Sequence, residues 1–289
     1  MFEHELVSRR SFFKLGGAGA AAAYAAAKSP ATWAAEAAAT EQKMTPKIGV
    51  QLYSVRDDCS KDLPGTITKV GKMGYTGVEF AGYYNRTAKD LRKLLDDSGL
   101  VCCGTHIGLN TMQGDALKAT VEFNKTLGNK NLICPGVQAK TRDDWLGMAK
   151  QFNDIADKLK PDGMRTGYHN HGAEFEPFPD GDKPWDVFFA NTKKEVIMQF
   201  DVGNAMPKGE AVFYLKKFPG RAVTMHVKPW SKTNRRALIG EDDLPWKEIF
   251  TLAETTGNTE WYIVEYEVPG TPAIEAIDKC LQALKKMGK

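Results

Sequence analysis

Short apolar runs alternate with segments of helical spacing along most of the chain. The runs have the length and the β-branched and aromatic content of strands. We expect eight strands, at residues 48–53, 75–80, 101–107, 131–137, 165–171, 196–202, 222–227 and 261–267. Between the runs, apolar residues recur three or four positions apart, which predicts helices; a clear case is Trp145, Met148, Phe152, Ile155 and Leu159.

Eight alternations of strand and helix predict a (β/α)8 barrel, for which about 250 residues is a typical length. The alternative is an open doubly wound sheet, which usually carries a glycine-rich phosphate loop after its first strand. The first expected strand continues into Gln51-Leu52-Tyr53-Ser54-Val55-Arg56, without glycine. This favours the barrel, and we expect residues 40–289 to form a single (β/α)8 TIM barrel in the α/β class.

The first 39 residues differ from the rest, with fourteen alanines and no aspartate. Ser8-Arg9-Arg10-Ser11-Phe12-Phe13-Lys14 precedes an apolar run at 15–27 and a small-residue end at 37–39. That order is typical of an export signal, and the arginine pair resembles a twin-arginine signal. We expect residues 1–39 to be a cleaved twin-arginine signal peptide and the protein to be exported, to the periplasm. The alternatives are an Ala-rich tail or an uncleaved anchor.

Charge and cysteine content narrow the function classes. The chain carries a net charge of +3, of which residues 1–39 contribute +1, so the remainder at +2 is too balanced to predict a nucleic-acid partner. No charge-free apolar stretch after residue 39 is long enough for a membrane span. Five cysteines without a CxxC pair argue against a disulfide framework or a zinc knuckle. We expect buried packing roles for Cys102, Cys103 and Cys134.

Polar side chains gather where the expected strands end, and catalytic groups of barrels lie at the carboxyl ends of strands. Four of the five histidines stand there, with several carboxylates, in the set Glu79, His106, His169, His171, Asp201, His226, Glu265 and Glu267. Imidazole and carboxylate ligands suit one divalent ion such as Mn²⁺, Zn²⁺ or Co²⁺. Residues two apart share a face of a strand, so either His169 or His171, and either Glu265 or Glu267, fits as a ligand.

These strand ends resemble the sugar phosphate isomerase/epimerase superfamily, the barrels related to xylose isomerase and endonuclease IV. The resemblance is carried by Gly77-Val78-Glu79-Phe80-Ala81-Gly82-Tyr83, Gly104-Thr105-His106, Tyr168-His169-Asn170-His171, Phe200-Asp201-Val202-Gly203-Asn204, His226-Val227-Lys228, Leu238-Ile239-Gly240-Glu241-Asp242-Asp243 and Val264-Glu265-Tyr266-Glu267. It implies one divalent metal ion held by strands five to eight, with His169, Asp201, His226 and Glu265 as ligands. The chain departs from many members at strand five, where they have glutamate and it has His169 or His171.

The remaining polar residues at this end of the barrel receive expected roles in proton transfer or substrate binding. We expect catalytic roles for Glu79, His171, Glu174 and Lys228. We expect substrate contacts from His106, Asn204 and Arg235, the last in a long loop at 230–246.

The resemblance implies proton abstraction beside a carbonyl, in a metal-dependent sugar isomerase or epimerase. Because sugar phosphates are cytoplasmic, an exported enzyme is expected to act on an unphosphorylated sugar or keto-glycoside. A two-glutamate epimerase mechanism fits poorly, so a lyase or hydrolase of 3-keto-glycosides is an alternative. A non-catalytic exported sugar-binding protein is an alternative of another class, and the modest charge disfavours a nuclease. The sugar, the metal and the oligomeric state stay open.

Overall fold

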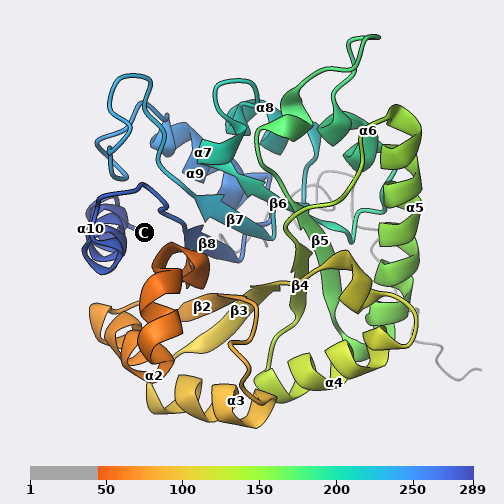
Figure 1. The fold of residues 1–289 in the computed structure, drawn as a ribbon. Coiled ribbons are helices and arrows are strands. Elements are labelled where there is room, and N and C mark those ends of the chain that lie inside the picture. The colour runs from red at the N-terminus through yellow and green to blue at the C-terminus, as the bar shows by residue number, and fades with distance from the viewer. Residues whose placement is uncertain (1–44) are drawn as a thin grey trace, which may run out of the picture. The chain divides into compact units, whose positions relative to one another are not determined.

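Eight parallel strands close into a barrel, with neighbours in chain order and the last strand paired with the first. This computed structural model describes residues 45–289, so the signal peptide expected at 1–39 lies outside the described residues. The strands are β1 (Lys47–Gln51), β2 (Gly77–Ala81), β3 (Val101–His106), β4 (Asn131–Cys134), β5 (Arg165–His169), β6 (Ile197–Asp201), β7 (Thr224–Val227) and β8 (Trp261–Val264). The predicted (β/α)8 barrel is confirmed (Figure 1).

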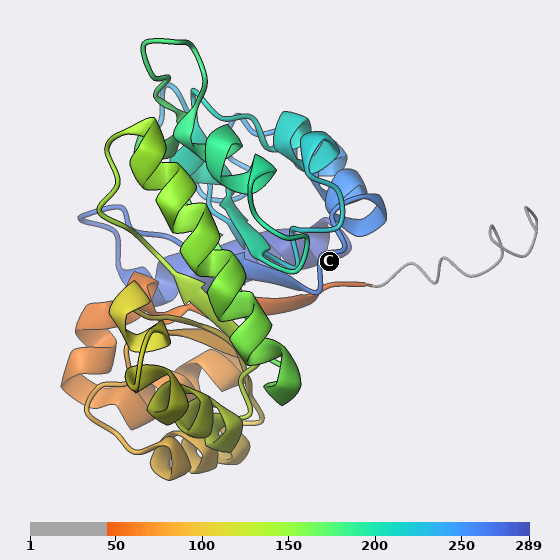
Figure 2. The same cartoon turned by 90° about the vertical axis from the view of Figure 1, so that its right-hand side faces the viewer.

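Helices surround the strands on the outside, as the two views at right angles show (Figures 1 and 2). The α-helices of the described residues are α2 (Arg56–Met73), α3 (Ala88–Asp97), α4 (Ala116–Leu127), α5 (Arg142–Leu159), α6 (Pro184–Ala190), α7 (Val202–Ala205), α8 (Ala211–Lys217), α9 (Trp246–Thr255) and α10 (Ala273–Lys286). Short 3₁₀ turns are η1 (Leu52–Val55), η2 (Leu109–Met112), η3 (Lys160–Asp162) and η4 (Ala173–Phe175). No helix in this part of the chain combines the length and apolarity needed to cross a membrane.

All eight predicted strands are present, but four of them, β1, β4, β5 and β8, end two or three residues earlier than predicted. After β1 the side chain of Gln51 accepts a hydrogen bond from the Tyr53 backbone N–H at 3.0 Å, which starts the η1 turn. After β8 the backbone N–H of Tyr266 donates to Ser54 Oγ at 3.0 Å instead of continuing the ladder. Polar side chains thus end the strands at the face where the chemistry was expected.

Alternation along the strands separates an outer apolar core from a polar interior. In β6, Met198 and Phe200 belong to the large core between strands and helices, whereas Gln199 and Asp201 are buried on the opposite face. Two small apolar clusters lie apart from that core; they comprise Cys103, Trp261 and Ile263, and Ile133, Ile197 and Val223. The barrel interior therefore has apolar layers and a polar layer that leads to the strand ends.

The five cysteines are all buried and unpaired, which confirms the packing role expected for three of them.

An aromatic cluster from β5, α5 and α6 supports the strand that carries the histidines. Tyr168 lies 5.3 Å from Phe188 and 6.0 Å from Phe152 and from Trp185 between ring centroids. The outward face of β5 is thereby fixed, and with it the inward direction of His169.

Candidate metal centre

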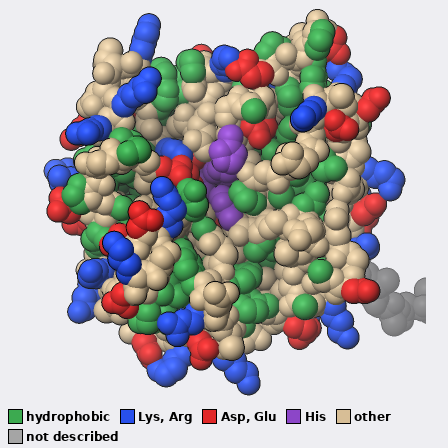
Figure 3. Space-filling model, in the orientation of Figure 1, with side chains coloured by type: hydrophobic (Ala, Val, Ile, Leu, Met, Phe, Trp, Pro, Cys, Tyr) green, Lys and Arg blue, Asp and Glu red, His purple; other side chains and the backbone are tan. Residues whose placement is uncertain are grey.

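Four side chains from neighbouring strands converge at the carboxyl end of the barrel. His169 ends β5, Asp201 ends β6, His226 lies in β7 and Glu265 follows β8, and one ligand atom from each lies within 4.8 Å of the others. All four residues are buried, with exposed fractions of 0–4%. We call them the metal-ligand cluster, and they are the four residues that the family resemblance implies as ligands. Histidine side chains are visible in the hollow at the centre of this face (Figure 3).

Strand register and alternation explain the convergence. Asp201 and His226 are direct partners in the ladder between β6 and β7, so their side chains point inward side by side. Asp201 also begins the short helix α7, where its Oδ1 accepts a hydrogen bond from the Asn204 backbone N–H at 2.6 Å. One carboxylate oxygen is thereby fixed by the backbone, and the other, Oδ2, is left for the cluster.

Three polar atoms of the cluster are buried without a hydrogen-bond partner: His169 Nδ1, Asp201 Oδ2 and His226 Nδ1. His226 Nδ1 lies 2.7 Å from Glu265 Oε2 and 3.7 Å from Asp201 Oδ2. Such buried groups are costly unless something satisfies them. Two imidazoles and two carboxylates form a donor set that Mn²⁺, Zn²⁺ and Co²⁺ accept, so the residues fit a divalent ion.

Glu79 lies behind the cluster and orients His226. Its Oε2 is 2.6 Å from His226 Nε2 and 2.7 Å from the amide of Gln51, and its Oε1 accepts from Gln199 Nε2 at 2.7 Å. A carboxylate on one ring nitrogen fixes the tautomer so that the other nitrogen offers its lone pair to a metal. Glu79 is fully buried, so the geometry favours a positioning role; the proton-transfer role expected for it stays a prediction.

Gly104 in β3 makes room for this carboxylate. A Cβ atom at position 104 would lie 2.5 Å from Glu79 Oε1, closer than such contacts occur. The absence of a side chain at Gly104 is therefore a condition for the observed position of Glu79.

Gln51 and Gln199 complete the layer beneath the cluster, and sequence analysis gave neither a role. Gln199 donates to Glu79 and to Thr224 Oγ1, so its carbonyl oxygen accepts from His106 Nε2 at 2.6 Å. Their role could have been predicted from their place in the sequence, because each is an amide at an inward position of a largely apolar strand. Both side chains are fully buried, and a buried amide needs a hydrogen-bond partner inside the barrel.

His106 stacks on His226, with ring centroids 5.3 Å apart and planes 5° from parallel. Its Nε2 lies 3.2 Å from Glu79 Oε2, and its side chain is one-tenth exposed. His106 also forms a compact trio with His169 and His226. The ring therefore borders the cluster from the β3 side, a position compatible with the substrate contact predicted for it.

Charges around the cluster are strongly coupled. Burial alone would lower the pKa of His226, but Glu79 and Glu265 outweigh it and hold that pKa well above its usual range. Burial would likewise raise the pKa of Glu265, but Lys228 and His226 keep it well below its usual range. For His169, burial and the neighbouring His226 lower the pKa well below the usual value. The carboxylates thus require positive charge among them, which a divalent ion would supply.

Lys228 lies at the edge of the cluster. Its Nζ is 2.9 Å from Glu265 Oε1 and also pairs with Glu267. Burial opposes its charge, but Glu265, Asp201 and Glu267 raise its pKa, so the ammonium is retained. The sequence left open whether Glu265 or Glu267 is the ligand. Glu265 belongs to the metal-ligand cluster, whereas Glu267 lies farther out, beyond Lys228.

His171 and Glu174 follow β5 and differ in their surroundings. The strand ends at His169, because the next residue, Asn170, turns to exchange hydrogen bonds with the backbone of Asp201 at 2.8 and 3.0 Å. His171 is consequently exposed, with its ring 5.2 Å from that of His169. Glu174 is buried and accepts from Tyr168 Oη at 2.7 Å and from the His171 backbone N–H at 2.9 Å. The acid–base role expected for Glu174 stays a prediction. These hydrogen bonds favour a role in which Glu174 holds the loop after β5 in place.

The other two predicted substrate contacts lie in different places. Asn204 is half-buried, with Nδ2 3.3 Å from the Asn170 carbonyl oxygen and 3.5 Å from His169 Nε2. Arg235 is exposed in the loop between β7 and α9, and no hydrogen bond or ion pair within residues 45–289 joins it to the metal-ligand cluster. The structure brings Asn204 to the site and leaves Arg235 on the surface.

Comparisons with known proteins agree with this architecture. The chain is 22% identical over 247 residues to the inosose dehydratase of Serratia proteamaculans, an alignment that covers 70% of this chain and 81% of that protein. A crystal structure of a sugar phosphate isomerase/epimerase from Parabacteroides distasonis superposes with a TM-score of 0.72 at 26% identity, covering 84% of this chain and 98% of that one. An L-ribulose 3-epimerase structure has the same fold, with a TM-score of 0.62 at 14% identity over 84% of this chain and 94% of that one.

The sequence also matches the family described as the xylose isomerase-like TIM barrel over residues 67–287, a span that includes β2 to β8 and all four residues of the metal-ligand cluster. The chain belongs to the xylose isomerase-like TIM barrel family.

Proposed function

We propose that the protein is a metal-dependent enzyme that removes a proton next to the carbonyl of an unphosphorylated sugar or keto-glycoside. The observation that carries the proposal is the metal-ligand cluster, in which one ligand atom from each of four buried residues lies within 4.8 Å of the others and three buried polar atoms make no hydrogen bond. A divalent ion held by His169, Asp201, His226 and Glu265 would supply Lewis-acid polarisation of the carbonyl.

The protein's own groups divide the remaining tasks. His171 is exposed beside His169, and imidazole is the side chain most often used for proton transfer, so we assign the proton to His171. Lys228 keeps its charge and is partly exposed, which suits binding of a hydroxyl or carbonyl oxygen. His106 and Asn204 border the same space and orient the sugar. Glu79 keeps His226 in place.

Two considerations support an unphosphorylated substrate. The twin-arginine sequence at residues 8–14 favours export, away from cytoplasmic sugar phosphates. Lys228, which pairs with the cluster residue Glu265, is also paired with Glu267 and leaves little net positive charge for a phosphate group.

The decisive experiment is solvent exchange. The metal-loaded enzyme, incubated in D₂O with 3-keto-glucose and with methyl 3-keto-glucoside, is expected to incorporate deuterium beside the carbonyl. Removal of the metal by a chelator should abolish the incorporation, and restoring the metal should recover it. If exchange is absent, a primary isotope effect on turnover tests for internal return of the proton. Turnover with neither exchange nor an isotope effect, with chemistry rate-limiting, would contradict proton abstraction.

A second candidate is elimination of a group β to the carbonyl, as in a dehydratase or lyase. It is favoured by the similarity to proteins named inosose dehydratase. Both candidates begin with the same proton abstraction, and the products separate them. An isomerase or epimerase returns a sugar of unchanged composition, whereas elimination releases water or an alcohol and leaves an unsaturated ketone.

A further inference from the structure

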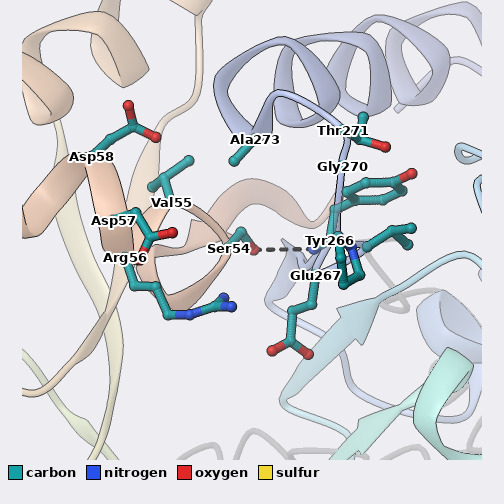
Figure 4. A pocket seen from close by; sticks show the side chains of 12 residues that line it. Ser54, Val55, Arg56, Asp57, Asp58, Tyr266, Glu267, Gly270, Thr271 and Ala273 are labelled. Carbon is teal, nitrogen blue, oxygen red and sulfur yellow. Dashed lines mark hydrogen bonds between the residues drawn. The ribbon is translucent and has the colours of Figure 1, made fainter.

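A second hollow opens on the same face of the barrel, between the segment after β1 and the segment after β8. We call it the rim pocket; it is lined by residues 54–58 and by residues from 266 to 273 (Figure 4). Its volume is about 380 Å³, within the range of roughly 300–1,000 Å³ typical of small-molecule sites. The chemistry proposed above gives this pocket no role.

Glu267 connects the rim pocket to the metal-ligand cluster. Its side chain lines the pocket and pairs with Lys228, and Lys228 Nζ lies 2.9 Å from Oε1 of Glu265, a proposed metal ligand. Lys228 therefore contacts one residue of the metal-ligand cluster and one residue of the rim pocket. A molecule that reacts at the cluster and extends past Lys228 would approach the rim pocket.

Carboxylates are the commonest charged groups of the pocket wall, which also includes apolar residues such as Val55 and Val268. Asp57, Asp58 and Glu267 contribute carboxylates against the single guanidinium of Arg56, and Thr271 adds a hydroxyl group. Arg56 and Glu267 extend into the hollow from opposite walls (Figure 4). Carboxylates accept hydrogen bonds from hydroxyl groups, but repel phosphate and carboxylate groups of a ligand. The wall chemistry selects a neutral ligand rich in hydroxyl groups.

An exposed aromatic ring stands beside the pocket. Tyr53 is 45% exposed, and Arg56 holds it by stacking at 4.4 Å from the ring centroid and by donating to its carbonyl oxygen at 2.8 Å. A ring fixed in this way is a rigid surface with an apolar face and a polar hydroxyl end, which suits the mixed C–H and O–H surface of a pyranose. Tyr53 does not line the pocket itself, but its contact with Arg56 places an exposed aromatic ring next to the pocket wall.

We propose that the rim pocket is a subsite for the second ring of a glycoside. The ring that reacts occupies the metal-ligand cluster, and its neutral, hydroxyl-rich neighbour lies between η1 and the segment after β8. This inference rests on the proposed function and narrows its substrate class from sugars in general to molecules of two rings.

Filling the pocket tests the assignment. Thr271→Trp places an indole in the hollow, and Thr251→Trp on α9 makes the same change away from both sites. For Thr271→Trp we expect KM for 3-keto-maltose to rise about tenfold or more, while kcat/KM for 3-keto-glucose and the metal content stay as in the wild type. Thr251→Trp should match the wild type with both substrates. Equal effects of Thr271→Trp on the two substrates, or no effect on either, would overturn the subsite.

A binding experiment separates this inference from the proposed chemistry. Calorimetric titration of the metal-loaded protein with maltose, which is not a ketone, requires no turnover. Binding by the wild type and by Thr251→Trp, but not by Thr271→Trp, supports the subsite even if no proton exchange is found with any keto sugar. Absence of maltose binding in all three proteins, or equal binding by all three, contradicts the subsite even if exchange is observed.

Discussion

The two halves of the barrel contribute different chemistry to the same face. Strands β5–β8 provide all four residues of the metal-ligand cluster. Strands β2 and β3 provide Glu79 and His106, which contact His226 from behind and from the side, and β1 provides Gln51, which donates to Glu79. The second half provides the proposed ligands of the metal, and the first half holds one of them, His226, in its orientation. The difference teaches that a polar residue at a strand end need not face the substrate.

Removing a ligand from the second half should have the largest effect. Asp201→Ala and His226→Ala each take away one ligand, so we expect bound metal to fall from about one ion per chain to nearly none. Activity should drop by at least the roughly 10²–10⁴-fold that loss of an acid–base group causes. Elemental analysis after dialysis measures the metal, and circular dichroism checks the fold. Folded variants with full metal content would place the site elsewhere.

Two residues of the loop after β5 are expected to have different roles: His171 carries the proton, and Glu174 holds the loop in place. His171→Asn should lower kcat by roughly 10²–10⁴-fold and leave the metal bound, because it removes the proposed proton carrier but no ligand. Glu174→Gln weakens the hydrogen bonds to Tyr168 and to the His171 backbone, so we expect a lower melting temperature and a smaller fall in kcat. The reverse order of the two kcat values would assign proton transfer to Glu174.

Changing the first half should weaken metal binding without abolishing it. Glu79→Gln preserves shape but removes the charge that accepts the His226 Nε2–H, so metal affinity should fall about 10–100-fold. Competition with a metal-indicator dye measures the affinity. Glu174→Gln is the matched control, since it makes the same change in another buried carboxylate that lies outside the metal-ligand cluster. Equal affinities in the two variants would show that Glu79 does not tune the site.

A methyl group at position 104 should act on the same carboxylate indirectly. Gly104→Ala crowds Glu79, so we expect a loss of unfolding free energy of about 1–3 kcal/mol and a fall in metal affinity no larger than that of Glu79→Gln. Urea unfolding and the same dye competition supply the two values. Gly136→Ala, after β4, is the control, because a Cβ there meets no atom within 4 Å. Indistinguishable behaviour of the two alanine variants would contradict the packing argument.

The sequence predicted the fold well, because a repeated strand-and-helix pattern reflects local spacing. Asp201 and His226 lie at or next to the strand ends where the sequence predicts them, since the alternation of each strand continues to that point. Alternation could not decide between His169 and His171, because the answer depends on Asn170 turning the chain toward β6. The positioning role that the geometry favours for Glu79 could not be predicted from the sequence either, because it depends on hydrogen bonds across the barrel interior to residues distant in sequence.

The burial of every cysteine has a practical consequence for labelling and for the redox conditions that the protein tolerates. Thiolate is the form that reacts with alkylating reagents and oxidants, and burial raises the pKa of Cys59 and of Cys280 to about 11. Little thiolate therefore forms at neutral pH, so the native thiols are expected to react slowly with such reagents. A cysteine introduced at the exposed Asp57 would be the single reactive thiol, ready to carry a fluorophore that reports on ligands entering from solvent.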